Sequence, residues 1–217
     1  MIKIENIEVF NFDSAMRGCR NPLESWDKSD SYIDTLGSFI LGENDEILAL
    51  RLIKAGSDHS KFLRQIFVSM DITTAMSVWW DIDTYKVATV RNSTSRMHKL
   101  GSRLLTHDDF SWDNEAGDVI VTKLRLDTLA DLNDRIVKMQ NLRFIRDVSA
   151  TIIANNLFRD IVLDLPDSYN FLSTYTCNYE MLRNFYHARK NHKQREIREM
   201  CQVIEKLPYS QFITIEK

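Results

Sequence analysis

Alternating hydrophobic and polar positions predict strands in three parts of the chain. Residues 2–9 alternate around an irregularity at Asn6, and residues 62–72 alternate with one interruption at Arg64. Side chains of a strand point to opposite faces in turn, so each pattern indicates a strand with one face against a core. Residues 119–126 are predicted as a further strand.

Hydrophobic residues at three- and four-residue steps predict one long amphipathic helix from Leu129 to Ile152. A second helix is predicted over residues 44–55, because Gly56 follows it in the position that commonly ends a helix. Shorter helices are predicted at residues 74–83, 178–189 and 192–206.

Between these elements the chain is rich in turn-forming residues. Residues 13–30 mix Asp, Gly, Asn, Pro and Ser, and we expect a loop with one helical turn. Residues 86–98 contain a run of Asn, Ser and Thr, whose side chains bond their own backbone and favour turns. With strands mostly early, helices mostly late and no internal repeat, the sequence predicts a single α+β domain over residues 1–217.

The composition limits the classes of function. Hydrophobic residues make up 44% of the chain, enough for a sizeable core, and the formal net charge is −3. A general nucleic-acid binder needs a basic surface, so no nucleic-acid partner is expected, although one or two arginines suffice for a small nucleotide. Neither a signal peptide nor the about 18 apolar residues of a membrane span is visible. We therefore expect a cytoplasmic protein without a membrane partner.

Cysteine and histidine patterns predict no metal site. Cys19, Cys177 and Cys201 are widely spaced, and their odd number fits a reducing compartment. The five histidines are scattered, and each alone is most simply a surface or structural residue. No phosphate-binding loop, dinucleotide fingerprint or hydrolase elbow is present.

The C-terminal sequence combines two asparagines with an arginine at fixed spacing. Asn178 is followed six residues later by Asn184, and Arg189 comes five residues after Asn184. Together with Phe185 and the helix opening at Gln194, this arrangement resembles the flavin-dependent thymidylate synthase family, ThyX. The resemblance implies that Arg189 lies against the pyrimidine of dUMP and helps to ionise N3, while the two asparagines line the flavin ring. A guanidinium keeps its proton and can stabilise a pyrimidine anion. Without the resemblance, Arg189 is most simply a cation at a helix C-terminus.

Two earlier stretches resemble the same family in the family's order. Residues 58–68 are similar to the family's strand entry, and Ser60 would lie near the flavin phosphates there, a strand-capping serine being the alternative. Residues 85–98 are similar to its flavin signature at Asn92 and Ser95. By themselves, these polar residues form an ordinary turn.

The flavin signature is altered in this chain. The Arg-His-Arg that grips FAD in the family is Tyr85-Lys86-Val87 here, so that Lys86 could hold one phosphate as a point charge. Beside Ser95, which the resemblance places against dUMP, Arg96 stands next to the position of the family's substrate-binding arginine. The resemblance further implies that Arg159 is a ligand of the dUMP phosphate.

The resemblance implies a mixed sheet flanked by helices and a homotetramer. The implied reaction methylates dUMP at C5, with methylenetetrahydrofolate as carbon donor, NADPH as reductant and FAD as hydride carrier. Two alternatives stay open: a non-catalytic relative that binds a pyrimidine nucleotide, and an enzyme that accepts another pyrimidine nucleotide or transfers a hydroxymethyl group.

Overall fold

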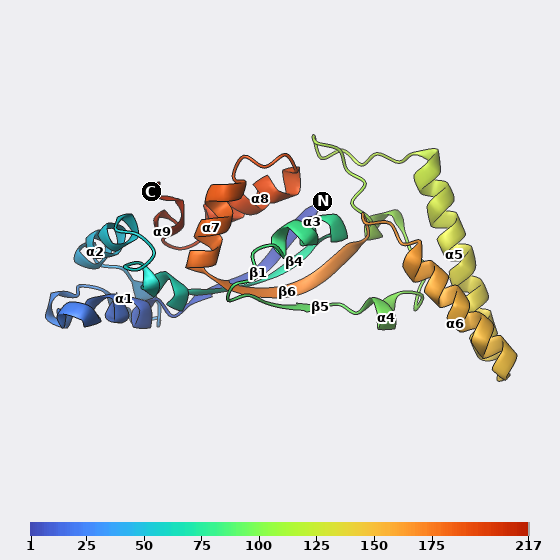
Figure 1. Cartoon of the computed structure of the whole chain (residues 1–217), viewed down its shortest axis with the longest axis horizontal. Coiled ribbons are helices and arrows are strands. Elements are labelled where there is room, and N and C mark those ends of the chain that lie inside the picture. Colours follow the sequence, from blue (N-terminus) through green and yellow to red (C-terminus); the bar gives the residue numbers. More distant parts are fainter. Residues whose placement is uncertain (217) are drawn as a thin grey trace. The chain divides into compact units, whose positions relative to one another are not determined.

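The computed structural model describes residues 1–216 of the chain (Figure 1). Its main sheet has four strands in the order β1-β4-β6-β5 and is antiparallel. Two further short strands, β2 and β3, pair with each other in antiparallel fashion. The strands are β1 Ile2–Phe10, β2 Tyr32–Ile33, β3 Phe39–Ile40, β4 Phe67–Ala75, β5 Val90–Ser93 and β6 Asn170–Asn178.

Helices make up most of the remaining regular structure. The α-helices are α1 Phe12–Arg20, α2 Glu43–Lys54, α3 Met76–Ile82, α4 Arg96–Lys99, α5 Lys123–Phe144, α6 Val148–Leu163, α7 Tyr179–Arg189, α8 Arg195–Ile204 and α9 Gln211–Thr214. The 3-10 turns are η1 Asn21–Leu23, η2 Trp26–Lys28, η3 Lys61–Gln65 and η4 His107–Asp109. Within residues 1–216, none of the helices combines the length and the apolar character that crossing a membrane requires.

The chain divides into two compact units. The first unit contains residues 1–3, 72–82 and 92–173, and the second unit contains residues 4–71, 83–91 and those from 174 onward. Each unit has its own set of helices and its own buried side chains.

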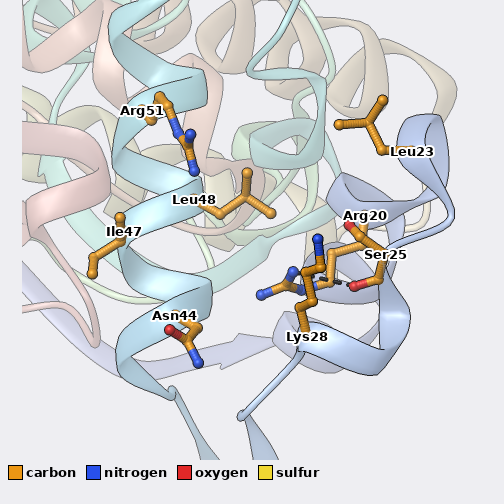
Figure 2. Close-up of a pocket in the computed structure, with 8 residues that line it drawn as sticks. All are labelled: Arg20, Leu23, Ser25, Lys28, Asn44, Ile47, Leu48 and Arg51. Carbon is orange, nitrogen blue, oxygen red and sulfur yellow. Dashed lines mark hydrogen bonds between the residues drawn. The ribbon is translucent and has the colours of Figure 1, made fainter.

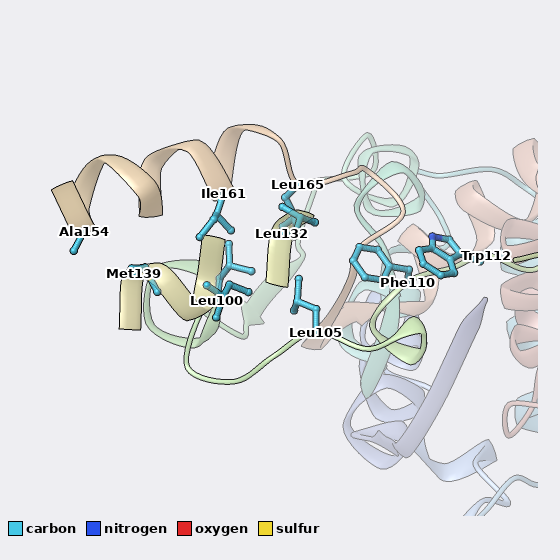
Figure 3. Packing of buried hydrophobic residues seen from close by; sticks show 10 residues of the cluster. Leu100, Leu105, Phe110, Trp112, Leu132, Met139, Ala154, Ile161 and Leu165 are labelled. Carbon is cyan, nitrogen blue, oxygen red and sulfur yellow. The ribbon is translucent and has the colours of Figure 1, made fainter. Parts of the chain in front are cut away.

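The first unit is built around a helical hairpin. Helices α5 and α6 lie side by side (Figure 1). The chain reverses between them at Asp147, whose carboxylate accepts a hydrogen bond of 3.0 Å from the backbone N–H of Ala150 and so caps α6. Apolar residues of the hairpin and of the segments before and after it form one buried cluster (Figure 3). Its members are Leu100, Leu105, Phe110, Trp112, Leu132, Ile136, Met139, Ala154, Ile161 and Leu165.

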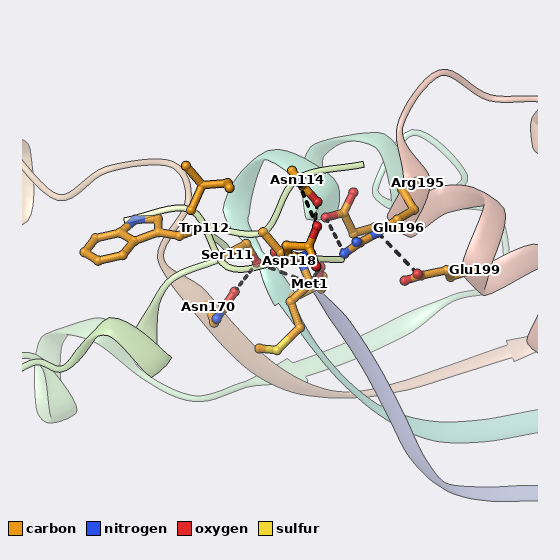
Figure 4. Close-up of polar contacts among 12 residues, drawn as sticks. Met1, Ser111, Trp112, Asn114, Asp118, Asn170, Arg195, Glu196 and Glu199 are labelled. Carbon is orange, nitrogen blue, oxygen red and sulfur yellow. Dashed lines mark hydrogen bonds and ion pairs between the residues drawn. The ribbon is translucent and has the colours of Figure 1, made fainter. Parts of the chain in front are cut away.

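Polar contacts fasten the start of the chain to the first unit (Figure 4). The ammonium group of Met1 forms an ion pair of 2.7 Å with Asp113. The hydroxyl of Ser111 donates to Oδ1 of Asn170 at 2.7 Å. These contacts fix residues 1–3 and the loop before α5 against the beginning of β6.

The second unit has an aromatic core. The ring of Phe12 stacks on Phe39 at 5.7 Å between centroids and meets the rings of Tyr179 and Tyr209 edge-on. Edge-on and offset contacts are the favoured geometries of aromatic pairs. They join α1, β3 and the start of α7 into one packed body.

Across the sheet in the second unit, side chains form a polar ladder. Asp71 accepts hydrogen bonds from Asn6 on β1, at 2.8 Å, and from Thr174 on β6, at 2.6 Å. The bond from Thr174, and then that from Asn6, keeps the pKa of Asp71 below its ordinary value. The ladder therefore favours one register of the three strands.

Several sequence predictions are confirmed. The fold is α+β with a sheet flanked by helices, and the N-terminal strand is present, with its irregularity at Asn6 in the left-handed region (φ 50°). Helix α2 ends before Gly56, whose φ of 107° suits a residue without a Cβ. The predicted helices over residues 74–83, 178–189 and 192–206 correspond to α3, α7 and α8.

Other predictions are wrong. The predicted loop with one turn over residues 13–30 begins instead within helix α1, Phe12–Arg20, because Phe12, Ala15 and Met16 form a buried face. The predicted strand over residues 62–72 begins only at Phe67, since residues 61–65 form a 3-10 turn.

The errors continue in the first unit. Residues 119–126 are not a strand, because Thr122 caps the start of α5 by accepting from the N–H of Arg125. The single helix over residues 129–152 is two helices, separated where Asp147 caps α6. Strand β6 was not predicted at all.

Candidate functional site

The second unit has a hollow of about 590 Å³ between residues 84–88 and the N-terminal half of α7. We call it the Tyr85 hollow. It is lined by Arg64, Phe67, Thr84, Tyr85, Lys86, Val87, Ala88, Asn178, Glu180, Met181 and Asn184. Its volume lies within the range of small-molecule sites, about 300–1,000 Å³.

One wall is made where β6 turns into α7. Asn178 ends the strand, and its side-chain oxygen accepts from the N–H of Met181 at 2.9 Å, which caps the helix. Leu182 and Phe185 then face the core, while Glu180 and the exposed Asn184 face the hollow. The cap occupies Oδ1 of the buried Asn178, so its Nδ2 is the atom left to meet a ligand.

The opposite wall is the segment before β5. The ring of Tyr85 meets the core ring of Phe185 at 5.1 Å and a steep angle, which holds Tyr85 in place. Ala88 adopts a left-handed backbone (φ 58°), a conformation that non-glycine residues seldom adopt. The chain is thereby bent so that Lys86 and Val87 line the same hollow.

Arg189 lies beside this hollow at the end of α7. Its guanidinium carbon is 5.4 Å from the centre of the Tyr85 ring, within the range of a cation–π contact. Its Nε is buried and has no hydrogen-bond partner among the described residues. A buried donor without an acceptor is costly in folded proteins, so a rearrangement that gives this atom an acceptor would be favourable.

The cations around the hollow differ in their partners. Arg64 forms a two-point ion pair with Glu180, in which Nη2 donates to Oε1 at 3.0 Å and Nε donates to Oε2. The hydrogen bond and the charge of Glu180 raise the pKa of Arg64 above its ordinary value. Within residues 1–216, Lys86 is the lining cation without a carboxylate partner.

These residues fit a planar ring with one phosphate better than a complete dinucleotide. Phe67, Tyr85 and Met181 offer apolar surfaces for a flat ring, and Asn184 offers an exposed amide at its edge. A pyrophosphate needs several charge-assisted hydrogen bonds, whereas Lys86 supplies one unpaired cation. The flavin ring therefore fits here more readily than the rest of FAD.

The structure brings four of the predicted site residues together. Lys86, Asn178 and Asn184 line the Tyr85 hollow, and Arg189 adjoins it through Tyr85. Ser60 also belongs to the second unit, but it is buried before η3 and does not line the hollow.

The other four predicted residues belong to the first unit. Asn92 is exposed on β5, and Ser95 precedes α4 without capping it through its side chain. The guanidinium of Arg96 lies 5.7 Å from the ring of Phe171. Arg159 is exposed on α6.

Sequence reasoning missed three residues of the hollow. Tyr85 was considered only as the residue that stands where the family has an arginine. Arg64 was considered only as the interruption of a strand, and Glu180 had no assigned role. The signal for Glu180 was available, since an acidic residue in the first turn of a helix is stabilised by the positive end of the helix. Its pairing with Arg64, 116 positions away, had no local signal.

Comparison of the fold with solved structures finds flavin-dependent thymidylate synthases. A crystal structure of thymidylate synthase X from Helicobacter pylori with FAD and dUMP has a TM-score of 0.68 and 15% identity, covering 98% of this chain and 95% of that one. A second structure of the H. pylori enzyme complexed with FAD and dUMP has a TM-score of 0.60 and 16% identity, covering 97% and 95%.

A third similar structure is that of a UMP/dUMP methylase. The UMP/dUMP methylase PolB from Streptomyces cacaoi, bound with 5-Br dUMP, has a TM-score of 0.59 and 16% identity, covering 94% of this chain and 88% of that one. No protein family profile and no curated protein sequence matches the chain. At these identities the comparisons show that the chain has the ThyX-like fold over nearly its whole length.

Proposed function

We propose that this ThyX-like fold serves a divergent flavin-dependent thymidylate synthase-like enzyme that binds dUMP beside Arg189. The observation that carries the proposal is the buried, unpartnered Nε of Arg189, next to a hollow that also holds Asn178 and Asn184. The likeness to proteins solved with FAD and dUMP supports the choice of ligands.

The proposed reaction is reductive methylation of dUMP at C5, with methylenetetrahydrofolate as carbon donor and NADPH as reductant. FAD, when bound, supplies the hydride transfer. The chain itself orients the pyrimidine and polarises it: Arg189 holds negative charge that develops on the ring when N3 loses its proton. Asn184 donates its amide to the edge of a bound ring.

The resemblance assigns roles in dUMP and flavin binding to the remaining predicted residues. Arg159 would bind the dUMP phosphate, with Ser95 and Arg96 against the nucleotide. Ser60, Lys86 and Asn92 would contact the flavin. Because Tyr85-Lys86-Val87 replaces a fork of arginine and histidine donors, we expect FAD to bind more weakly than in the similar enzymes.

A homotetramer is part of the proposal. In the α5–α6 hairpin, Phe144 at the end of α5 is 85% exposed and Val148 at the start of α6 is 76% exposed. Ile152 and Leu163 are also exposed on α6. Exposed apolar residues that cluster on one element mark an interaction surface. Light scattering after size exclusion tests this point, and a clean monomer at micromolar concentration contradicts it.

One observation favours a second function, that of a non-catalytic relative that binds pyrimidine nucleotides. The ring of Tyr85 already covers the guanidinium of Arg189 at 5.4 Å. An entering pyrimidine therefore has to stack on Tyr85 or displace it. A protein that binds dUMP without turnover fits this arrangement.

Two measurements test the proposal. Calorimetry with dUMP and with UMP gives the substrate preference, UMP being included because one similar structure is a UMP/dUMP methylase. Thymidylate formation with FAD, NADPH and methylenetetrahydrofolate then separates the two functions. Binding with turnover supports the enzyme, and binding without turnover supports the non-catalytic relative. Absence of binding to both nucleotides contradicts both functions.

A further inference from the structure

A second hollow of the second unit contains an unusual set of cations. It has a volume of about 530 Å³ and lies between α2 and the segment from Arg20 to Lys28 (Figure 2). We call it the Arg51 hollow. Its lining residues are Arg20, Leu23, Ser25, Lys28, Asn44, Ile47, Leu48 and Arg51. Three of them are cations and none is an acid.

Helix α2 presents a separate face to this hollow. Its core side consists of Asp45, Ala49 and Ile53, which are buried at four-residue steps. Residues 44, 47, 48 and 51 recur at steps of three and four and line the hollow instead. Helix α2 therefore has two distinct faces. One face packs in the core, and the other lines the hollow with apolar side chains and a cation.

Arg20 is held in a fixed position in the floor of the hollow. It is 5% exposed, its Nε donates to Oδ1 of Asp45 at 2.6 Å, and its Nη1 donates to the carbonyl of Ser25 at 3.2 Å. Asp45 is fixed in turn by Ser29 and by the N–H of Ser31. Nη2 of Arg20 donates to no acceptor within residues 1–216, so a fixed lining residue keeps one donor for a ligand.

The other two cations have uncompensated charge. Among the described residues, neither Lys28 nor Arg51 forms an ion pair. Figure 2 shows them on the two sides of the hollow, Lys28 on the α1–η2 side and Arg51 on α2. Like charges that face one hollow repel each other, and an anion between them removes that repulsion.

The N-terminal N–H groups of α2 do not contribute to the hollow. Asp30 already accepts from the N–H of Asn44 at 2.9 Å and from that of Asp45 at 3.1 Å. The attraction for an anion thus comes from side chains, and it is set by Arg20, Lys28 and Arg51.

We propose that the Arg51 hollow binds a phosphate ester whose organic part is apolar or aromatic. Two exposed cations and one fixed guanidinium match a phosphate dianion, which can accept several charge-assisted hydrogen bonds at once. Leu23 and Ile47 are exposed at 85% and 54% and offer an apolar surface beside these cations. The volume suits a nucleoside monophosphate.

This site is separate from the proposed dUMP site. The Arg51 hollow and the Tyr85 hollow share no lining residue. The inference therefore stands independently of the proposed function, and changes in one hollow test it without touching the other.

Calorimetry on the full chain at low salt tests the proposal, with AMP, ribose 5-phosphate and inorganic phosphate as probes. We expect Lys28→Gln and Arg51→Gln each to weaken AMP binding at least about tenfold, because each removes a charge-assisted hydrogen bond. Lys54→Gln is the matched control, since it removes a cation from the same helix outside the hollow. Lys86→Gln is the control for the Tyr85 hollow. Both are expected to leave AMP binding unchanged.

The three probes distinguish the sources of affinity. Tighter binding of AMP than of ribose 5-phosphate, and of either than of inorganic phosphate, supports a contribution from the apolar surface. Equal affinities for all three overturn the part of the proposal that concerns the organic group. If no probe binds, or if Lys28→Gln and Arg51→Gln bind AMP as the wild type does, the site itself is overturned.

Discussion

The cations of the two hollows in the second unit differ in whether the chain supplies them with partners. Around the Tyr85 hollow, Arg64 is paired with Glu180 and Arg189 is covered by an aromatic ring, so that among the described residues Lys86 is the cation left without a partner. In the Arg51 hollow, Arg20 is paired with Asp45, while Lys28 and Arg51 form no ion pair with any residue that the structure describes.

The difference bears on how each site recognises a ligand. In the Tyr85 hollow a ligand competes with Glu180 and Tyr85 for the arginines. The binding free energy is therefore the difference between the contacts that the ligand makes and those that it replaces. Among the described residues, no acidic group pairs with Lys28 or Arg51 in the Arg51 hollow. A ligand there therefore gains from direct charge attraction. The first arrangement favours selectivity for shape, and the second favours affinity for any phosphate of suitable size.

The largest expected effect is on the stability that the ion pair of Arg20 and Asp45 gives to the Arg51 hollow. Asp45 is fully buried against Arg20, so Asp45→Asn leaves a buried guanidinium without its counter-charge. We expect a loss of about 3–5 kcal/mol of unfolding free energy, measured by urea denaturation. Asp27→Asn, an exposed residue of η2, is the control and should change stability little.

The same pair predicts a dependence on pH. Burial acts to raise the pKa of Asp45, but hydrogen bonds from Ser29, Ser31 and Arg20 outweigh it and leave the pKa below its ordinary value. The stabilisation is therefore complete above the unfolded pKa of about 3.9 and is lost as the pH falls through the folded pKa. Urea denaturation below about pH 4 should show this loss in the wild type and a smaller one in Asp45→Asn.

The next effect concerns Arg189. Arg189→Lys keeps the charge but removes the planar fork and the buried Nε, so dUMP binding should weaken at least about tenfold, for a contact worth roughly 1.5–3 kcal/mol. Calorimetry measures this, and turnover should fall in parallel if the protein is an enzyme. Arg143→Lys, on α5 in the first unit, serves as the control. Equal dUMP affinities of Arg189→Lys and wild type would exclude Arg189 from the site.

A smaller effect is expected at the aromatic ring that covers this arginine. Tyr85→Leu keeps an apolar side chain against Phe185 but removes the cation–π contact, worth about 0.5–1 kcal/mol. If Tyr85 competes with the pyrimidine, dUMP should bind about two- to fivefold more tightly in calorimetry. Weaker binding would show that the ring stacks on the nucleotide and belongs to the site.

The smallest effect concerns the pair at the rim of the Tyr85 hollow. Glu180→Gln releases the half-exposed Arg64 from its ion pair. The freed guanidinium should raise the affinity for FAD about two- to fivefold, since exposed ion pairs contribute little. Flavin fluorescence titration measures this change, and adding salt should reduce it. An unchanged FAD affinity would place the flavin phosphates away from Arg64.

The sequence predicted elements whose signals are local. Helix α2 was found because Gly56 marks its end, and the N-terminal strand was found together with its irregular Asn6. The error at residues 129–152 also has a local cause: Asp147 is a strong capping residue, but the hydrophobic steps continue across it and hide the break.

The site was predictable only where spacing within one helix defines it. Asn178 and Asn184 lie on one wall of the Tyr85 hollow because a capped helix places them there. The pairing of Arg64 with Glu180 and the contact of Tyr85 with Arg189 join residues more than 100 positions apart. Such contacts depend on tertiary packing, which leaves no periodic pattern in the sequence.

The sharp break at Asp147 also has a consequence for the order of folding. Helices α5 and α6 are separated by three residues, so their contacts are close in sequence and can form rapidly, on the timescale of local loop closure. The second unit joins three separate stretches of chain, the last of which begins at residue 174. On a ribosome, the whole hairpin would therefore leave the exit tunnel before Arg189 does, and the Tyr85 hollow would be among the last features to form.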